Sequence, residues 1–233
     1  MCSSDLADRK GTMPILSHAV IRASDTGVEV CATNLNTSTT VAIDGSHIAA
    51  RGSIAVEARA LASMVTLLSG DTVRLVSDGD KGVFVKAGRS TARFACLPVR
   101  DFPKLPSFDG WWSFVNAGNV DALAVVAPAA CADETRFHLC GVAIDGDRMV
   151  ATDGHRLHVA ACDLASGKGV RIVPAKAVAE LRRVLDGGDA SVAWTDHHLF
   201  ARNATTTLAI KLIDAQFPPR RQVVPSEAGS KAH

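Results

Sequence analysis

The stretch Ala151-Thr152-Asp153-Gly154-His155-Arg156-Leu157 (ATDGHRL) is the most informative part of the chain, because the segment that leads into it occurs twice. The run 147–153 (DRMVATD) resembles the run 27–34 (GVEVCATN), with an offset of 119 residues between Asp153 and Asn34. A sequence that resembles itself at a fixed spacing indicates a duplicated structural unit. Further matches in the same order are therefore expected on both sides of this stretch.

Two more matches support the duplication. Residues 53–61 (SIAVEARAL) resemble residues 170–178 (VRIVPAKAV) at an offset of 117 residues. The tripeptide 101–103 (DFP) precedes its counterpart 216–218 (QFP) by 115 residues. The small drift in offset fits loops of different length, which surface connections tolerate. The chain is therefore predicted to contain two copies of one module.

Each module is predicted to contain short alternating strands around one amphipathic helix, an α+β arrangement. The first helix, over 57–68, has apolar residues at Leu61, Met64, Val65 and Leu68, the spacing of one buried stripe. The second, over 174–185, has the same kind of stripe, and a third helix is expected within 120–127. The Pro- and Gly-containing tract 97–111 is interpreted as a linker. The expected strands are 19–23, 28–33, 38–43, 72–77, 82–86, 91–96, 141–144, 148–152, 157–162, 190–194, 199–203 and 206–213.

Composition excludes several classes of protein. Of the 233 residues, 47% are apolar and 21% charged, so the chain can form a core and is not of the disordered type. No apolar run is long enough to cross a bilayer, and residues 1–16 have no secretory signal. The six cysteines include no C-x-x-C pair and are interpreted as reduced thiols of a cytoplasmic protein. A net charge of +1 does not indicate bulk attraction to nucleic acid, although a local basic surface remains open.

Several motifs then give a specific resemblance. They closely resemble, in the same order, the bacterial sliding clamp, the β subunit of DNA polymerase III, over about residues 9–225. The first module contributes KGTMPIL at 10–16 and LPVRDFP at 97–103. The second contributes RFHLCGV at 136–142, ATDGHRL at 151–157, VPAKAVAEL at 173–181, KLIDAQFP at 211–218 and VVP at 223–225.

The resemblance implies tandem duplicated clamp-type domains, with antiparallel sheets outside and helices on one face. Family members close six such domains into a ring around duplex DNA. The expected boundaries are 1–103 for the first domain, 104–111 for a linker, 112–225 for the second domain, and 226–233 for a polar tail that begins the next linker.

A DNA-facing surface is implied by the resemblance. A protein that slides needs Lys and Arg directed at phosphates and few contacts to base edges. The Lys and Arg residues on the polar side of the helix 174–185 could also belong to an ordinary solvent-exposed face without a ligand. The expected DNA-binding residues are Lys10, Arg136, Phe137, His138, Lys176, Arg182 and Arg183.

A second site is implied for short extended peptides of partner proteins, in an apolar groove. Gly154 permits close backbone approach, Leu139, Leu157 and Pro225 supply apolar surface, and His155 and Arg156 orient the peptide or brace the loop. A turn that is purely structural would contain the same Asp153 and Gly154. The expected peptide-binding residues are Leu139, Thr152, Gly154, His155, Arg156, Leu157 and Pro225.

The predicted function is that of a processivity factor that tethers the replicative polymerase, the clamp loader and repair proteins to double-stranded DNA, independently of sequence, as a ring-forming homo-oligomer. No catalysis, cofactor or metal is expected. One alternative is a degenerate clamp that binds peptides without retaining DNA. Another is a hydrolase built on Asp153, His155 and His158, but no motif completes such a site.

The chain departs from the family in two places. A third domain has no counterpart, and the strand and amphipathic helix expected before Met13 are not found; residues 1–6 match no family motif. We interpret the chain as a fragment of a longer product, with a two-domain protomer that assembles in threes as the alternative. The uncovered face should make the first module less stable, and the isolated chain is expected to be monomeric or to aggregate, without retaining DNA topologically.

Overall fold

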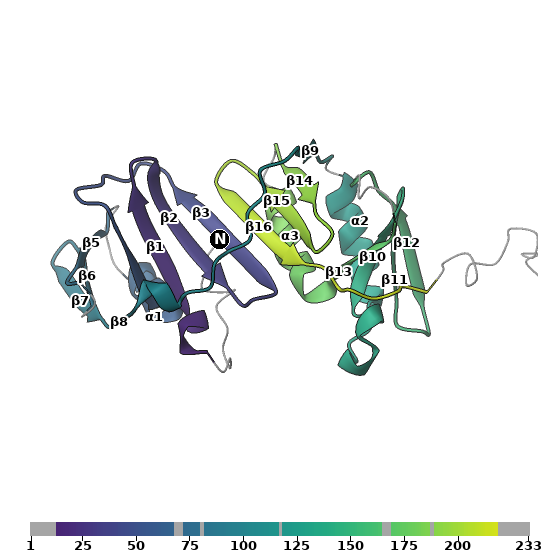
Figure 1. Ribbon diagram of the computed structural model, residues 1–233, viewed down its shortest axis with the longest axis horizontal. Helices are drawn as coiled ribbons and strands as arrows, with labels where there is room; N and C mark the ends of the chain where they lie inside the picture. Colours follow the sequence, from purple (N-terminus) through teal and green to yellow (C-terminus); the bar gives the residue numbers. More distant parts are fainter. Residues whose placement is uncertain are drawn as a thin grey trace, which may run out of the picture. The chain divides into compact units, whose positions relative to one another are not determined.

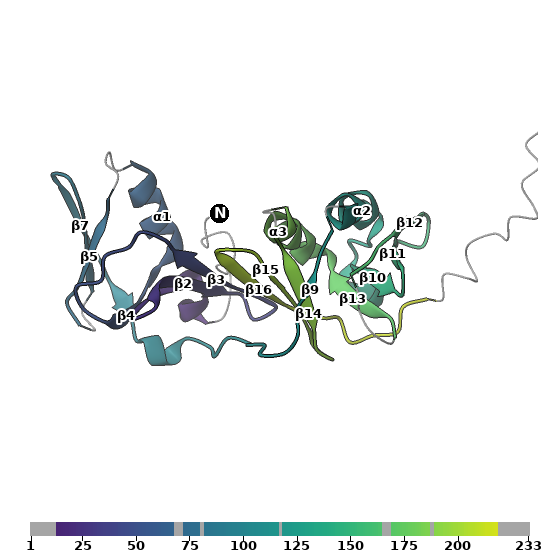
Figure 2. The same ribbon diagram turned by 90° about the horizontal axis from the view of Figure 1, so that it is seen from above.

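The computed structural model describes residues 13–67, 72–79, 82–116, 118–164, 169–186 and 189–218. These residues form two compact units. One comprises the described residues up to 109 together with 202–209, and the other comprises 110–201 together with the described residues from 210 on. Each unit combines antiparallel strands with helices (Figures 1 and 2), so the expected α+β fold is confirmed.

The first unit contains two antiparallel sheets. Five strands lie in the order β8-β4-β1-β2-β3, and β5, β6 and β7 form the other sheet. Successive residues of β1 enter different apolar clusters, because side chains alternate along a strand: Val20 packs with Ile15 and Phe102, and Ile21 packs with Val83. The strands are β1 (His18–Ser24), β2 (Gly27–Thr33), β3 (Thr37–Ile43), β4 (Gly52–Glu57), β5 (Arg74–Ser77), β6 (Val83–Ala87), β7 (Ser90–Phe94) and β8 (Cys96–Leu97).

The helix α1 (Ala58–Leu67) is less buried than its sequence pattern predicts. Leu61 and Met64 pack on the cluster around Val83, but Val65 is 41% exposed, so the expectation that Val65 is buried is wrong. Leu68 lies outside the described residues. Within the described part of the first unit, α1 is the single α-helix.

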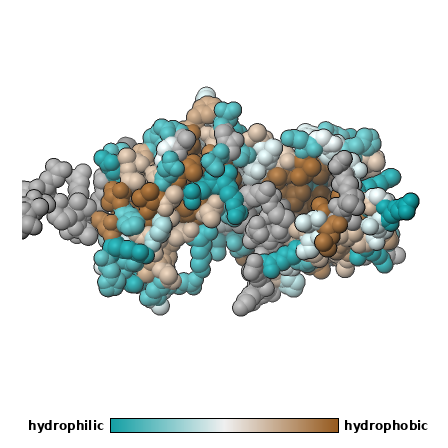
Figure 3. Space-filling model, turned by 180° about the vertical axis from the view of Figure 1, so that it is seen from behind, coloured by the Kyte–Doolittle hydropathy of each residue, from teal (hydrophilic) through white to brown (hydrophobic). Residues whose placement is uncertain are grey.

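The first unit also exposes a set of large apolar side chains. Figure 3 shows hydrophobic residues at the surface, viewed from the side opposite to Figure 1. Full burial of one such side chain would contribute on the order of 1 kcal/mol or more to the free energy of unfolding. The exposed residues on and after α1 are Val65, Leu67, Val73, Leu75 and Val76.

The second unit has a four-stranded antiparallel sheet in the order β12-β11-β10-β13. Helix α2 packs against β11 and β12, and α3 packs against β13 and β10. The two helices contact each other and lie on the same face (Figure 2). The elements are α2 (Gly118–Val126), β10 (Gly141–Asp145), β11 (Arg148–Thr152), β12 (Leu157–Ala161), β13 (Arg171–Pro174) and α3 (Ala175–Leu185).

Further strands lie before α2 and after α3. β9 (Ser113–Phe114), β14 (Ser191–Trp194) and β15 (His198–Arg202) are neighbours in that order, and β16 (Thr206–Lys211) spans the boundary between the units. Trp194 is held firmly, because its Nε1 donates to the carbonyl oxygen of the buried Leu164 at 2.8 Å and the Arg171 guanidinium lies 5.7 Å from its ring centroid.

The predicted apolar stripe of α3 is confirmed. The helix has two neighbouring surfaces to pack on, the sheet and α2, and so buries its whole apolar side. The buried residues are Ala177, Val178, Leu181, Val184 and Leu185.

The repeat found in the sequence marks a strand followed directly by a helix. α1 begins at Ala58 after β4, and α3 begins at Ala175 after β13, which is the same offset of 117 residues. Neither β4 nor β13 was predicted as a strand. Each joins its helix without a Gly or Asn turn to separate the two elements, so the pattern showed the helix alone.

The tract interpreted as a linker is only partly one. It begins in β8 and continues as a 3₁₀ turn at Val99–Asp101, after which Phe102 is 8% exposed in the core of the first unit. Leu105 also packs there, whereas Trp111 is 96% exposed. The segment up to Leu105 therefore belongs to the first unit.

Two further observations concern the described residues alone. No helix among them is long and apolar enough to span a membrane. The five cysteines among them are free thiols: Cys31 and Cys131 are buried, and Cys96, Cys140 and Cys162 are partly exposed.

Candidate functional site

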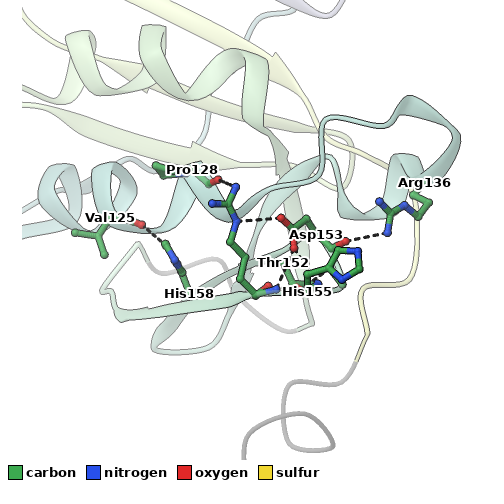
Figure 4. A network of polar contacts seen from close by, with 9 residues as sticks. Val125, Pro128, Arg136, Thr152, Asp153, His155 and His158 are labelled. Atoms are coloured by element: carbon green, nitrogen blue, oxygen red, sulfur yellow. Dashed lines mark hydrogen bonds and ion pairs between the residues drawn. The ribbon is translucent and has the colours of Figure 1, made fainter.

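The turn between β11 and β12 is built on the side chains of Thr152 and Asp153. Asp153 Oδ1 accepts the backbone N–H groups of His155 at 2.9 Å and Arg156 at 3.0 Å. Thr152 Oγ1 accepts the Gly154 N–H at 3.1 Å and donates to the Arg156 carbonyl at 2.6 Å. Gly154 has a φ of 91°, which an L side chain rarely adopts. Figure 4 shows this network.

Arg156 braces the turn with its side chain. Its Nε donates to Asp153 Oδ2 at 2.9 Å, and its Nη2 donates to the Pro128 carbonyl at 2.7 Å, in the 3₁₀ turn Ala127–Ala129 that follows α2. The two backbone N–H donors, with a further contribution from the Arg156 charge, lower the pKa of Asp153 to about 2. Of the two roles expected for Arg156, the contacts show bracing.

Arg136 reaches the same turn from the 3₁₀ segment η5 (Glu134–Leu139). Its Nη1 donates to the Asp153 carbonyl at 2.8 Å, and its Nε lies 3.6 Å from Asp133 Oδ2. A Cβ built on Gly154 would lie 3.3 Å from Arg136 Nη1. The guanidinium therefore packs against the glycine.

The two described leucines expected in the apolar groove belong to one cluster. Leu139 is 6% exposed and packs in the core with Phe217, and Leu157 is a partly buried neighbour of that cluster. His155 is exposed, as is Gly154. Pro225, the remaining member of the expected peptide site, lies outside the described residues.

Three of the basic residues expected to face DNA lie on the polar side of α3. Lys176, Arg182 and Arg183 are all exposed. Lys176 Nζ pairs with the Glu134 carboxylate, which raises the pKa of Lys176 and lowers the pKa of Glu134. Arg183 Nη1 lies 2.9 Å from Glu180 Oε1.

The aromatic residues expected near DNA are in η5. Phe137 is 55% exposed, and the ring of His138 meets it edge-on at a centroid distance of 5.9 Å. Lys10 lies outside the described residues. η5 thus has Phe137 and His138 beside Arg136, and contacts α3 through Glu134.

Two groups that organise this region were not predicted from the sequence: Asp133 and the carbonyl of Pro128. Asp153 was considered as part of a structural turn and of the catalytic alternative, but it was not named among the site residues. An Asp followed by Gly at a strand end is a recognisable signal for a turn in which the carboxylate accepts backbone N–H groups. The roles of Asp133 and Pro128 depend on tertiary contacts that no local pattern shows.

The catalytic alternative does not fit the geometry. The Asp153 carboxylate accepts bonds from two backbone N–H groups and from Arg156, and His158 Nδ1 contacts the Val125 carbonyl at 2.8 Å instead of Asp153 (Figure 4). No group of three or more His, Cys, Asp or Glu side chains in the described part of the chain could hold a metal ion.

Comparison with known proteins gives one answer throughout. Residues 3–106 match the family model of the DNA polymerase III beta subunit, N-terminal domain, and residues 120–219 match that of the central domain. The first match begins at residue 3, before residue 9, where the resemblance seen in the sequence begins.

Individual relatives agree. The beta sliding clamp of Pseudomonas aeruginosa is 28% identical over 94% of this chain, and that of Proteus mirabilis is 31% identical over 92%. The chain spans about 63% of the length of the first of these relatives and 61% of the second.

Solved structures show the same similarity. The DNA polymerase III subunit beta of Pseudomonas aeruginosa superimposes with a TM-score of 0.86 at 26% identity, covering 98% of this chain and 65% of that one. The sliding clamp of Bartonella birtlesii, solved bound to griselimycin, gives a TM-score of 0.85 at 30% identity and covers 96% of this chain and 64% of that one.

Proposed function

Because the chain belongs to the family of the DNA polymerase III β subunit, the bacterial sliding clamps, we propose that it serves as the part of a clamp that faces DNA and binds partner peptides. The observation that carries this proposal is the succession of two family matches, N-terminal and central domain, in that order over most of the chain. The proposed role is non-catalytic: the protein keeps other enzymes on double-stranded DNA.

The proposed DNA contact is the polar side of α3. Lys176, Arg182 and Arg183 are exposed there, while the opposite side of the helix is buried, so the helix has a fixed orientation and its charges are presented together. Phosphate contacts of this kind carry no sequence information, which suits a protein that must move along DNA. Lys10, Phe137 and His138 remain part of this proposal.

The proposed peptide site is the turn after β11 with its apolar neighbour Leu157. The turn exposes Gly154 and His155, and its backbone is fixed by Asp153 and Arg156. A pre-organised turn lowers the entropic cost of binding an extended peptide. Thr152 bonds to Gly154 and Arg156 within the turn, Leu139 belongs to the apolar cluster on which Leu157 packs, and Pro225 completes the proposed site.

The partners are part of the same proposal. They are the replicative polymerase, the clamp loader and repair proteins, each bound through a short linear peptide, in a ring-forming homo-oligomer located in the cytoplasm. Two solved relatives are described as sliding clamps bound to griselimycin. We propose griselimycin as a small probe for the turn after β11.

The decisive experiment measures retention of the full chain on nicked circular plasmid and on the same plasmid after linearisation, with light scattering to report the number of copies. Retention on the circle and loss from the linear form would show that copies of this chain close a ring by themselves. Equal binding to both forms is the result expected of a fragment, and no binding to either form would argue against a DNA-facing role. Griselimycin binding without any DNA retention would favour a peptide-binding scaffold.

A charge variant tests the proposed DNA surface. Arg183→Glu should weaken binding to a short duplex and reduce the salt dependence of that binding, by about 0.9 in the log–log slope for each phosphate that the protein no longer neutralises. Arg100→Glu is the control, because Arg100 is also exposed but lies in the first unit. Equal effects of the two variants would contradict the assignment to α3.

A further inference from the structure

The side chain of Arg136 is directed at the proposed peptide-binding turn. Its Nη1 donates to the Asp153 carbonyl at 2.8 Å, and the same nitrogen lies against Gly154, where an added Cβ would approach it to 3.3 Å (Figure 4). A guanidinium is planar and always charged, so this hydrogen bond is charge-assisted and directional. It therefore fixes the peptide group between Asp153 and Gly154.

Arg136 is also fixed from its own segment. Its Nε lies 3.6 Å from Asp133 Oδ2, and Asp133 Oδ1 accepts the N–H and the hydroxyl of Thr135, at 3.0 and 2.7 Å. The backbone at Arg136 leaves the helical conformation, with φ −100° and ψ 50°, and this divides η5 into two turns. The guanidinium is thus held between Asp133 and the turn.

The same segment is bound to α3 two residues earlier. Glu134 pairs with Lys176 at the start of that helix. The described contacts therefore run from the basic helix, through Glu134 and Arg136, to Asp153 and Gly154.

We propose that Arg136 is a positioning residue of the peptide-binding turn, which holds the Asp153–Gly154 backbone and links it through η5 to the DNA-facing helix, and not a contact to DNA phosphate. This inference rests on the proposed function. It assigns Arg136 a role different from the DNA contact implied by the family resemblance.

The test compares Arg136→Met, which keeps the length of the side chain but has no donor, with Arg136→Lys, which restores one charged donor. In the full chain, amide hydrogen exchange at His155 and Arg156, followed by NMR, should be about tenfold faster in Arg136→Met, the factor that corresponds to losing one hydrogen bond, and should return toward the original rate in Arg136→Lys. Griselimycin should bind the Met variant about tenfold more weakly, with the same rescue. Arg182→Met, at an exposed arginine of α3, is the matched control and should leave both measurements unchanged.

A second measurement separates positioning from phosphate contact. In a titration of a short duplex at several salt concentrations, Arg182→Met should reduce the salt dependence, whereas Arg136→Met should leave it unchanged. The opposite result, a reduced slope with unaltered turn amides in Arg136→Met, would overturn the inference. If Arg136→Met does not fold, Arg136→Gln, with one neutral donor, replaces it and should give an intermediate exchange rate.

The wild-type chain distinguishes failure of this inference from failure of the proposed function. If it binds griselimycin and duplex but the Met variant behaves identically in every measurement, the positioning role is wrong and the proposed function stands. If it binds neither, the proposed function fails and the inference fails with it.

Discussion

Leu35 and Gly154 occupy the same position of the same turn in the two units, 119 residues apart, with φ angles of 71° and 91°. Thr33 Oγ1 accepts the Leu35 N–H at 3.0 Å, as Thr152 Oγ1 accepts the Gly154 N–H at 3.1 Å. In the first unit Asn34 Oδ1 accepts two backbone N–H groups, as Asp153 does in the second. The duplication thus extends to individual hydrogen bonds, but the first unit has leucine where the second has glycine.

Replacing Leu35 with glycine should stabilise the first unit. The left-handed conformation costs an L residue roughly 1–2 kcal/mol, and glycine removes this cost. Glycine also has greater freedom in the unfolded chain, which offsets about 0.5–1 kcal/mol of the stabilisation. Because Leu35 is 54% exposed, little apolar burial is lost. We expect a net gain of about 0.5–1 kcal/mol in urea unfolding followed by circular dichroism. Leu35→Ala is the control, since it keeps the Cβ; if it stabilised as much as glycine, strain at this residue would not be the cause.

The opposite change, Gly154→Ala, should destabilise the second unit and weaken griselimycin binding. Alanine at a φ of 91° is strained, and its Cβ would displace Arg136 Nη1. We expect a loss of about 1–2 kcal/mol. Gly146→Ala separates the two causes, because Gly146 also has a positive φ, of 62°, but nothing lies within 4 Å of its Cβ position. Calorimetry with griselimycin should show weaker binding for Gly154→Ala but not for Gly146→Ala. If both variants lost affinity equally, displacement of Arg136 would have no specific effect on binding.

The stability of the second unit should depend on pH through Asp153. Its pKa is lowered from 3.8 to about 2 in the folded chain, so its ionised form stabilises the fold above about pH 4, and this contribution is lost as the pH falls toward 2. Asp153→Asn keeps an oxygen that can accept the two N–H groups but removes the charge that pairs with Arg156. Urea midpoints measured between pH 5 and about pH 2 should therefore fall less steeply for the variant. Parallel curves for the two proteins would show that another carboxylate dominates in this range.

Gly141 should tolerate no side chain. It begins β10, opposite Pro174, and a Cβ there would meet the Val173 carbonyl oxygen at 2.5 Å and Ile172 Cγ2 at 2.7 Å. Gly141→Ala should cost about 1–3 kcal/mol, the usual cost of overfilling a core. Gly52→Ala is the matched control, because Gly52 also begins a strand and has nothing within 4 Å of its Cβ position. Differential scanning calorimetry should show a lower Tm for Gly141→Ala and an unchanged Tm for Gly52→Ala. An unchanged Tm for Gly141→Ala would mean that β13 moves aside at little cost.

The sequence predicts most strongly what depends on local pattern. The apolar stripe of α3 and the repeat that joins Ala58 to Ala175 were both visible, because helical spacing and similarity between segments are properties of the sequence alone. Val65 fits the same helical pattern as the stripe of α3, yet it is exposed. Its burial depends on what packs against α1, which periodicity does not reveal.

The sequence predicted which residues form the candidate site better than it predicted how their side chains contact one another. The residues of the turn were named from the motif, but the contact of Arg136 with the Asp153 carbonyl was not predicted. Its direction follows from a non-helical backbone at one residue and from a carbonyl 17 positions later. Such a contact depends on how η5 is placed beside the turn after β11, and nothing in the spacing of the residues encodes it.

The anchored indole of Trp194 determines how this molecule can be observed. The three tryptophans are at positions 111, 112 and 194, all outside the first unit, and the chain contains no tyrosine. Intrinsic fluorescence therefore reports the second unit and the segment that enters it, whereas far-ultraviolet circular dichroism reports both units. A difference between the two unfolding midpoints would directly measure how independently the two copies of the module unfold.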